Sequence, residues 1–319
     1  MVFRLGETLP VLGQVALVLA AIALVAILSL FILTLRRPVA ATVWFRRKRL
    51  ARAGFVKTTV PTSAGPQIVW HGGSGPLLVL LHGAGDQAGT WHKTAPDLAR
   101  KYSLVMPELA GHGESAPPSG PLSIGTILGA LDQVLDSAPW KSQSFILAGN
   151  SLGAWMAMLY SRTHADRVSR LLLISGGALR SEQAEVTLLP KNREEARKVF
   201  DAILDPSSPR PPAFVLDDVV RIAKGGPIAR IAAMAADIPG YTLDGKLAGF
   251  PVPVDIIWGA SDELIPIDYA REMEAQLPAA RLTVIERCGH IPQLECPERL
   301  LETLHRLLAT EPPQSKTAG

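Results

Sequence analysis

The sequence has little of what metal-binding, disulfide-rich or nucleic-acid-binding proteins need. It contains only two cysteines, Cys288 and Cys296, with no Cys-x-x-Cys pair and no Cys/His metal spacing. Neither a zinc site nor a disulfide framework is indicated, and a single bond between the two cysteines stays open. The formal net charge of +3 is too small to indicate nucleic acid as a partner. Neither a G-x-G-x-x-G nor a Walker sequence is present, so no nucleotide-phosphate loop is predicted.

Charge is also missing from one long apolar stretch, which runs from Val11 to Leu35. As a helix this stretch would be about 37 Å long, enough to cross a hydrocarbon core of about 30 Å. A buried soluble helix would be shorter and more amphipathic. A cleaved signal peptide would have a basic segment before a shorter apolar run. We therefore predict an N-terminal leader over residues 1–10 and a transmembrane helix over residues 11–35.

Basic residues follow this apolar stretch rather than precede it. Before it stands Arg4 with the amino terminus, and after it come Arg36, Arg37, Arg46, Arg47, Lys48, Arg49 and Arg52. The positive-inside rule then predicts a single-pass protein with its catalytic domain in the cytoplasm. Residues 36–55 are predicted to be a basic juxtamembrane segment close to anionic lipid. Deletion of residues 1–52 is expected to release a soluble, active domain.

After residue 55 the sequence alternates between apolar runs and helical patterns, which indicates a mostly parallel sheet covered on both faces. Strands are expected over residues 67–72, 76–83, 103–109, 144–150, 168–176, 253–260 and 281–286. Helices are expected over residues 90–102, 123–138, 151–164, 268–277 and 297–308. Between residues 178 and 247 the alternation stops, and short amphipathic helices rich in proline replace it. We predict one α/β domain over residues 56–310, with a helical insertion over 178–247 and a disordered tail over 311–319.

One short motif interrupts the core pattern, the Gly-Asn-Ser-Leu-Gly run from Gly149 to Gly153. A strand that ends at Asn150 and passes directly into a helix forces a sharp turn at Ser151. The two glycines lie two residues on either side, where a side chain would collide across the turn. This is the nucleophile-elbow pattern G-x-S-x-G, which exposes a serine hydroxyl at the edge of a sheet. Ser151 is therefore the candidate nucleophile.

A serine hydroxyl needs a base, and the base needs an acid that fixes its tautomer. His290 follows the last expected strand, in a loop that begins with glycine. Asp262 follows the preceding strand in a Gly-Ala-Ser-Asp turn, with Glu263 as a neighbouring rival. The chain order Ser151, Asp262, His290 is that of the α/β-hydrolase fold. These three residues are the candidate triad.

Two backbone amides are candidates for stabilising an oxyanion. The amide of Leu152 follows the nucleophile at the start of a helix, and that of Ala84 lies in the loop after the strand that ends in His82-Gly83. We interpret the side chains of His82 and His112 as supports of their loops rather than as catalytic groups.

Five motifs together resemble the α/β-hydrolase superfamily over residues 56–310. They are LLHGAGDQAGTW, PELAGHGES, LAGNSLGAW, VPVDIIWGASDELIP and CGHIPQLECPE. The resemblance implies an eight-stranded, mostly parallel sheet, a helical lid and no cofactor or metal. It also assigns Ser151 as nucleophile, Asp262 as acid, His290 as base, and the amides of Ala84 and Leu152 as the oxyanion hole.

The N-terminal span followed by this domain looks like the membrane-anchored monoacylglycerol lipases. The chain departs from the superfamily pattern at Glu108, where many relatives have aspartate, and at Ala154, where a second glycine is common. The aspartate-nucleophile relatives, haloalkane dehalogenases and epoxide hydrolases, are disfavoured because position 151 is serine.

These observations predict a serine hydrolase of carboxylic esters, with lipid or other apolar acyl esters as substrates and the bilayer as a partner. Two alternatives remain open at this point. One is a carbon–carbon bond hydrolase of ring-cleavage products, which uses the same catalytic set. The other is a non-catalytic α/β-hydrolase-like scaffold that binds a partner. Apolar residues of the insertion recur at helical spacing: Val199, Phe200, Ile203, Phe214, Val215, Val219, Ile231 and Met234. Most of them are expected to pack the insertion onto the domain, and a subset is expected to line an acyl pocket.

Overall fold

The computed structural model describes residues 8–180 and 186–314 of the chain, without the side chains of residues 8–12 and 27–33. Residues 1–7 of the predicted leader over 1–10 and residues 315–319 of the predicted tail over 311–319 therefore lie outside the described residues, whereas residues 8–10 begin the first helix. Residues 311–314 have no regular secondary structure.

Eight strands form one mixed sheet in the order β1-β2-β4-β3-β5-β6-β7-β8. The β1–β2 and β2–β4 pairs are antiparallel, and the other pairs are parallel. The expected mostly parallel, eight-stranded sheet is therefore confirmed. The strands are β1 (Val56–Thr62), β2 (Gly65–Gly73), β3 (Leu77–Leu81), β4 (Ser103–Pro107), β5 (Phe145–Asn150), β6 (Val168–Ile174), β7 (Val254–Gly259) and β8 (Ala280–Ile285).

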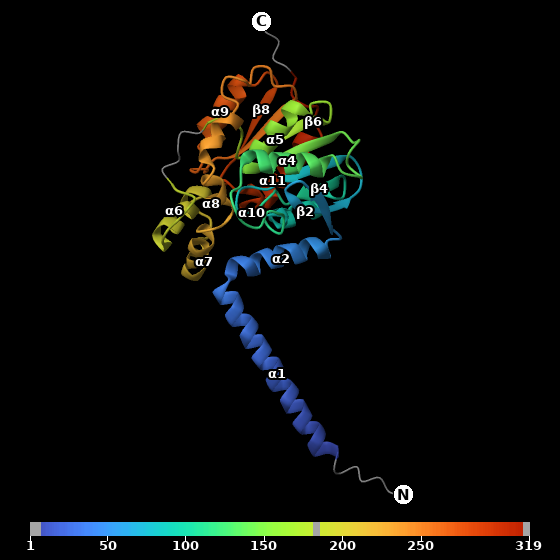
Figure 1. The fold of residues 1–319 in the computed structure, drawn as a ribbon, viewed down its shortest axis with the longest axis vertical. Coiled ribbons are helices and arrows are strands. Elements are labelled where there is room, and N and C mark those ends of the chain that lie inside the picture. Colours follow the sequence, from blue (N-terminus) through green and yellow to red (C-terminus); the bar gives the residue numbers. More distant parts are fainter. Residues whose placement is uncertain (1–7, 181–185, 315–319) are drawn as a thin grey trace.

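Helices cover both faces of this sheet and connect its parallel strands (Figure 1). The α-helices are α1 (Thr8–Arg36), α2 (Pro38–Arg52), α3 (Ala95–Leu98), α4 (Ile124–Leu135), α5 (Leu152–Thr163), α6 (Arg193–Ile203), α7 (Ala213–Ala223), α8 (Pro227–Ala232), α9 (Ile267–Gln276), α10 (Pro292–Glu295) and α11 (Pro297–Leu308). Two 3₁₀ helices, η1 (Ala88–Lys93) and η2 (Ala235–Tyr241), complete the described helices.

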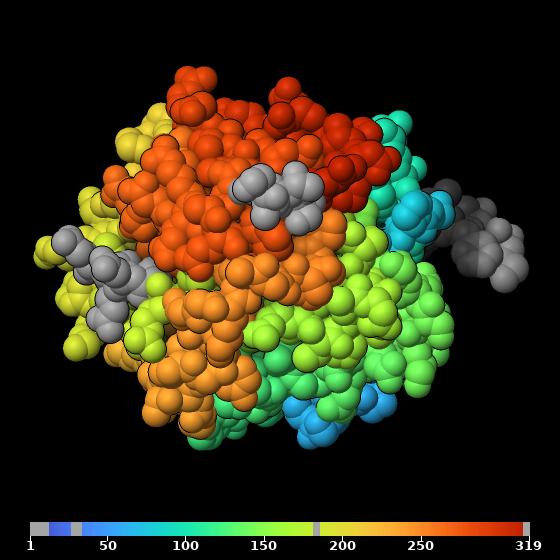
Figure 2. Space-filling model, turned by 90° about the horizontal axis from the view of Figure 1, so that it is seen from above, coloured from blue at the N-terminus to red at the C-terminus, as the bar shows by residue number. Residues whose placement is uncertain are grey.

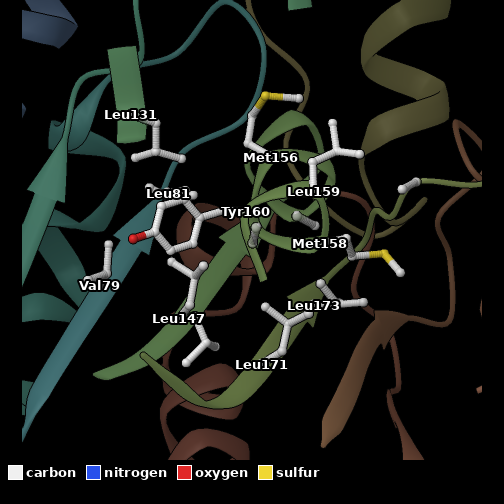
Figure 3. Close-up of a cluster of buried hydrophobic side chains, with 14 of the residues drawn as sticks. Val79, Leu81, Leu131, Leu147, Met156, Met158, Leu159, Tyr160, Leu171 and Leu173 are labelled. Atoms are coloured by element: carbon white, nitrogen blue, oxygen red, sulfur yellow. The ribbon is translucent and has the colours of Figure 1, made fainter. Parts of the chain in front are cut away.

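One hydrophobic core lies between the sheet and helices α4, α5 and α9. Figure 3 shows part of it: Leu147 of β5 lies next to the ring of Tyr160 of α5, and Leu171 of β6 belongs to the same cluster. All five residues of β3 are buried because helices cover both faces of the central strands. Full burial of one such leucine stabilises the fold by about 1.5–3 kcal/mol, so this continuous apolar sheet is the rigid base of the site.

The second core lies on the opposite face of the sheet, under α2, η1, α3 and α11. Helix α2 therefore packs as part of the α/β domain, whereas the sequence predicted a juxtamembrane segment separate from it. Its Leu50 is completely buried in this core. Arg47 of the same helix forms an ion pair with the buried Glu108, which directly follows β4. The expectation that residues 1–52 can be removed without loss therefore conflicts with the packing.

Helix α1 extends away from the domain as a long rod (Figure 1). Its described apolar side chains are mostly exposed to solvent, including Leu17, Leu19 and Val25. Within the part of the chain that the structure describes, no helix is both long and apolar enough to cross a bilayer. The transmembrane helix predicted over residues 11–35 is therefore not confirmed.

The insertion lies between β6 and β7 and contains α6, α7, α8 and η2. Arg230 of α8 fastens it to the loop after β4, because its guanidinium donates to the carbonyl oxygens of Gly111, Pro117 and Gly120. Seen from above, the end of the molecule away from α1 is formed largely by orange and red residues of the C-terminal part (Figure 2). The insertion lies on the other side of the domain, where α7 contacts both α1 and α2 (Figure 1).

Cys288 and Cys296 form a disulfide that encloses α10 and the loop before it. Both cysteines are buried in the second core. The sequence indicated no disulfide framework and left this single bond open, because spacing alone does not show that the chain folds back between the two residues.

Candidate active site

The predicted elbow at Ser151 joins β5 directly to α5. Ser151 has φ 53° and ψ −117°, a backbone conformation that non-glycine residues rarely adopt. Its amide donates to the carbonyl of Ile174 at the end of β6, which helps to hold this conformation. Such strain at a single serine persists only where the surrounding fold enforces it, as at catalytic sites.

Small residues around the elbow make this turn possible. A Cβ at Gly149 would overlap the backbone of Gly153, and a Cβ at Gly153 would collide with the backbone of Leu81. A Cβ at a third glycine, Gly176, would collide with the Cα of Ser151. The collisions expected at the first two positions are confirmed, so the glycines allow strand, turn and helix to pack closely.

His290 and Asp262 are hydrogen-bonded to one another at the carboxyl ends of β8 and β7. The Nδ1 atom of His290 lies 2.8 Å from Oδ2 of Asp262, and both side chains are buried. The other carboxylate oxygen of Asp262 accepts from the amides of Leu264 and Ile265. These bonds hold the carboxylate in place, leaving Nε2 as the free ring nitrogen of His290. Glu263, the rival acid, is exposed.

The two predicted oxyanion amides lie on either side of Ser151. Leu152 begins α5, and Ala84 lies in the loop after β3 on the wall of the same cavity as Ser151. That loop comes close to the elbow, since a Cβ at Gly83 would lie 3.3 Å from the Cβ of Ser151. Among the hydrogen bonds of the described residues, neither amide has an acceptor. Both are therefore available to a developing negative charge.

Two buried histidines support the loops around the site, as the sequence indicated. The Nε2 atom of His82 accepts from the amide of Leu109, and its Nδ1–H donates to the carbonyl of Gly83. Burial lowers the pKa of His82 to about 4 and that of His112 to about 3. Both rings are therefore neutral at pH 7.

A cavity of about 460 Å³ opens at Ser151 and His290. Its walls are mostly hydrocarbon and come from the insertion, the loop after β3 and helix α2. Of the apolar residues expected to line it, the insertion contributes Val199, Phe200, Ile203, Val215 and Val219. Phe214 is exposed, and Ile231 packs against the first core, so these two residues belong to the part of the set that does not line the cavity. Met234 is not among the residues that line the cavity.

Sequence reasoning missed the contribution of α2 to the cavity. Val39, Thr42, Val43 and Arg46 line its wall, and they follow the i, i+3, i+4, i+7 spacing of one helical face. That spacing was readable in the sequence, but the basic residues around it favoured the membrane interpretation. Within the described ranges, no group of three or more metal-ligating side chains is close enough to hold a metal ion.

A second missed feature is a buried amide network that links the elbow to the base loop. The Nδ2 atom of Asn150 donates to the backbone carbonyl of His290, and its Oδ1 accepts from Gln293. The side chain of Gln293 also reaches Oγ1 of Thr90. This network fixes the position of the loop that carries His290 relative to Ser151.

Comparisons with known proteins agree with this fold. A curated relative, the pimeloyl-[acyl-carrier protein] methyl ester esterase of Aliivibrio salmonicida, is 27% identical over 75% of this chain and 94% of its own. The crystal structure of a membrane phospholipase A, described as a bacterial virulence factor, matches with a TM-score of 0.71 at 24% identity and covers 92% of this chain and 97% of that one.

A third similar structure is the 2-hydroxy-6-oxo-6-phenylhexa-2,4-dienoate hydrolase from Rhodococcus sp. strain RHA1. Its TM-score is 0.66 at 22% identity, and the match covers 79% of this chain and 98% of that one. The structural neighbours thus include esterases, lipases and hydrolases of ring-cleavage products. A family model described as "Alpha/beta hydrolase family" matches residues 78–303, which contain Ser151, Asp262 and His290. The chain therefore belongs to the α/β-hydrolase family, and it is an α/β-hydrolase enzyme whose relatives include esterases and lipases.

Proposed function

We propose that the protein hydrolyses carboxylic esters through a covalent acyl-enzyme. Ser151 attacks the ester carbonyl while Nε2 of His290 takes its proton, and Asp262 stabilises the resulting imidazolium through the Nδ1–H bond. The amides of Ala84 and Leu152 donate to the oxyanion of the tetrahedral intermediate. The imidazolium then protonates the departing alkoxide. Water, activated by the same imidazole, releases the acid and restores Ser151.

The observation that carries this proposal is the arrangement around Ser151. A strained serine, a buried His290–Asp262 pair and two unused amides meet at the end of one cavity. Each removed oxyanion donor typically costs about 10²–10³ in rate, so the two amides can contribute substantially to catalysis. A non-catalytic scaffold has no need of this combination.

We infer that the acyl group is apolar, as in a monoacylglycerol-like or other lipid ester. The cavity wall facing Ser151 carries valine, isoleucine and phenylalanine side chains from α6 and α7. Each buried methylene of a substrate is worth about 0.8 kcal/mol, so kcat/KM should rise with acyl length until the cavity is full. The similar methyl ester esterase and membrane phospholipase A act on compounds with acyl chains, which agrees with this inference.

The wall from α6 and α7 suits an apolar acyl chain better than the polar ends of a ring-cleavage product, the substrate of the alternative carbon–carbon hydrolase. A conjugated keto-acid carries oxygen atoms at both ends of a short chain, and these need hydrogen-bond donors. The described side chains of α6 and α7 that line the cavity offer none. An ester with a hydrocarbon chain leaves no polar group unpaired against this wall.

We also propose that α1 and the outer face of α2 attach the protein to a membrane. The described apolar side chains of α1 are exposed, and the outer face of α2 presents Trp44 and Phe45 beside Lys48 and Arg49. Aromatic and basic residues in this combination favour the interface of an anionic bilayer.

A fluorophosphonate probe and a series of 4-nitrophenyl esters test the enzymatic proposal. Wild-type protein should be labelled, Ser151→Ala should not be, and kcat/KM should increase from acetate to a medium-chain ester. A protein that is labelled but cleaves only a dienoate keto-acid would support the alternative hydrolase. Wild-type protein that neither reacts with the probe nor cleaves any ester would refute catalysis.

A further inference from the structure

Helix α2 forms one wall of the substrate cavity, although it lies outside residues 78–303 that match the family. The wall on this side is not uniformly apolar. Thr42 and Arg46 face the cavity together with Val39 and Val43. The cavity lining from α6 and α7 is hydrocarbon. The polar side chains Thr42 and Arg46 therefore distinguish the α2 part of the lining from the part that α6 and α7 supply.

Arg46 and its neighbour Arg47 have very different partners. The guanidinium of Arg47 is saturated, because it donates to both carboxylate oxygens of Glu108 and also to Glu114 and Gln87. Arg46 has a single ionic partner among the described residues, Asp86, at 3.6 Å. No hydrogen bond of its guanidinium occurs within the described part of the chain. Its donors are therefore free to bind another acceptor.

The position of Arg46 suits the recognition of a substrate. Asp86 lies two residues after Ala84, so the pair stands beside the loop that supplies one oxyanion amide. Both side chains are only 22% exposed, and in a partly enclosed cavity a cation attracts an anion more strongly than in bulk water. The planar guanidinium also matches the oxygen geometry of phosphate and carboxylate groups.

We propose that Arg46 is a specificity-determining residue that binds an anionic oxygen group of the substrate. This inference rests on the proposed ester hydrolysis and specifies its substrate class further. The apolar acyl chain lies against α6 and α7, and the anionic group lies against α2. Aside from Arg46, the cavity lining among the described residues contains no lysine or arginine, so this side chain alone supplies the fixed positive charge.

The test compares three octanoyl substrates below their micellar concentrations, which removes effects of surface charge. They are 1-octanoylglycerol, 1-octanoylglycerol 3-phosphate and the monomethyl ester of octanedioic acid. The first is neutral, the second carries phosphate on the leaving group, and the third carries carboxylate on the acyl end. The measured quantity is the kcat/KM of each anionic substrate divided by that of the neutral one.

Arg46→Gln should lower this ratio about 10- to 100-fold for the substrate whose anion reaches α2, as expected for loss of a charged hydrogen bond. A loss with the phosphate identifies the leaving-group side, and a loss with the dioate identifies the acyl side. Asp86→Asn should raise the ratio, because it removes the carboxylate that competes with the substrate for Arg46. This variant still tests the inference if Arg46→Gln does not fold. Arg49→Gln, on the outer face of the same helix, is the matched control and should leave the ratio unchanged.

Two results would overturn the inference. One is an unchanged ratio in Arg46→Gln together with an unchanged ratio in Asp86→Asn, while the neutral ester is still cleaved. The other is an equal change of the ratio in Arg46→Gln and Arg49→Gln. By contrast, wild-type protein that cleaves none of the three esters would refute the proposed function itself.

Discussion

Arg47 and Glu108 connect helix α2 to the end of strand β4, because Nη2 of the arginine donates to both carboxylate oxygens at 2.8 and 2.9 Å. The glutamate side chain is completely buried, and burial raises its pKa. Removal of one partner from a buried ion pair leaves an uncompensated charge and costs about 3–5 kcal/mol. We expect Arg47→Ala to lower the free energy of unfolding by this amount in urea denaturation.

A matched control is available at the surface beside this pair. Lys57 pairs with Glu114 at 2.7 Å, and both side chains are 44% exposed. Lys57→Ala should cost at most about 1 kcal/mol. If the two variants were equally stable, α2 would not be held by the Arg47–Glu108 pair.

Truncation separates α1 from the rest of the protein. Deletion of residues 1–36 leaves α2 complete and should give a folded protein with wild-type activity on soluble esters. Deletion of residues 1–52 removes one cavity wall and the partner of Glu108, so its activity and melting temperature should both fall. An active, equally stable protein after the longer deletion would restore the original expectation from the sequence.

Asp262 and Glu263 form a natural pair of test and control. Asp262→Asn should lower kcat by about 10³-fold or more, because the amide no longer fixes the tautomer of His290 or stabilises its charge. Glu263→Gln should have little effect, since this side chain is exposed. The kcat of both variants on a simple ester decides which residue is the acid of the triad. A larger loss of kcat in Glu263→Gln than in Asp262→Asn would assign that role to Glu263.

Acid should destabilise the fold through His82 and His112. Because burial lowers their pKa values to about 4 and about 3, the unfolded chain binds more protons than the folded chain below pH 6.5. Stability is then complete above about pH 6.5 and decreases as the pH falls toward 4. The raised pKa of Glu108 acts in the opposite direction but involves a single group.

The urea midpoint measured at pH 7 and at pH 5 tests this dependence. It should be lower at pH 5, and His112→Gln should make the difference smaller because glutamine does not titrate. A midpoint that is the same at both pH values, or higher at pH 5, would contradict the structural role of these rings.

The disulfide predicts the compartment of the catalytic domain. Such bonds persist in oxidising compartments and are rare in the cytoplasm. We therefore expect the domain to face the oxidising side, opposite to the side that the basic residues after Leu35 predict. Two of those residues, Arg46 and Arg47, form ion pairs with carboxylates of the domain itself. They are therefore weaker evidence for topology under the positive-inside rule.

Thiol trapping in intact cells measures whether Cys288 and Cys296 are oxidised. After an acid quench, Cys288 and Cys296 should react with a maleimide–polyethylene glycol reagent only when a reductant has been added first. Two thiols that react without a reductant would instead support the cytoplasmic location.

Local patterns predicted most of the sheet and the site. The seven expected strands correspond to β2 to β8, because each is an apolar run bounded by glycine, proline or polar residues. Ser151, Asp262 and His290 were predicted as a triad from the turns after parallel strands, and the structure places His290 beside Asp262 and on the same cavity as Ser151. β1 was missed, since it is an edge strand in which only Val60 is buried.

Long-range contacts explain the remaining differences. The partner of Arg47 is 61 residues away, so no window of sequence indicates that α2 packs on the domain. The region expected as one helix over residues 90–102 is instead η1 and the short α3, because Pro96 and the packing of Trp91 interrupt it. Contacts between residues that are far apart in the sequence leave no periodic pattern from which they could be predicted.

A single residue, Arg37, separates α1 from α2, with φ −136° and ψ 58°. Beyond this break, α2 is held at its start by Asp218 of α7, which accepts from the amide of Val39, and at its centre by Glu108. A long flexible tether would let the catalytic domain rotate freely about its anchor. Here one pair of backbone torsions carries nearly all of that rotational freedom. When α1 is held in a bilayer as proposed, the direction in which the cavity faces depends mainly on the two backbone torsions of Arg37, and a few glycines inserted at residue 37 would widen the range of directions.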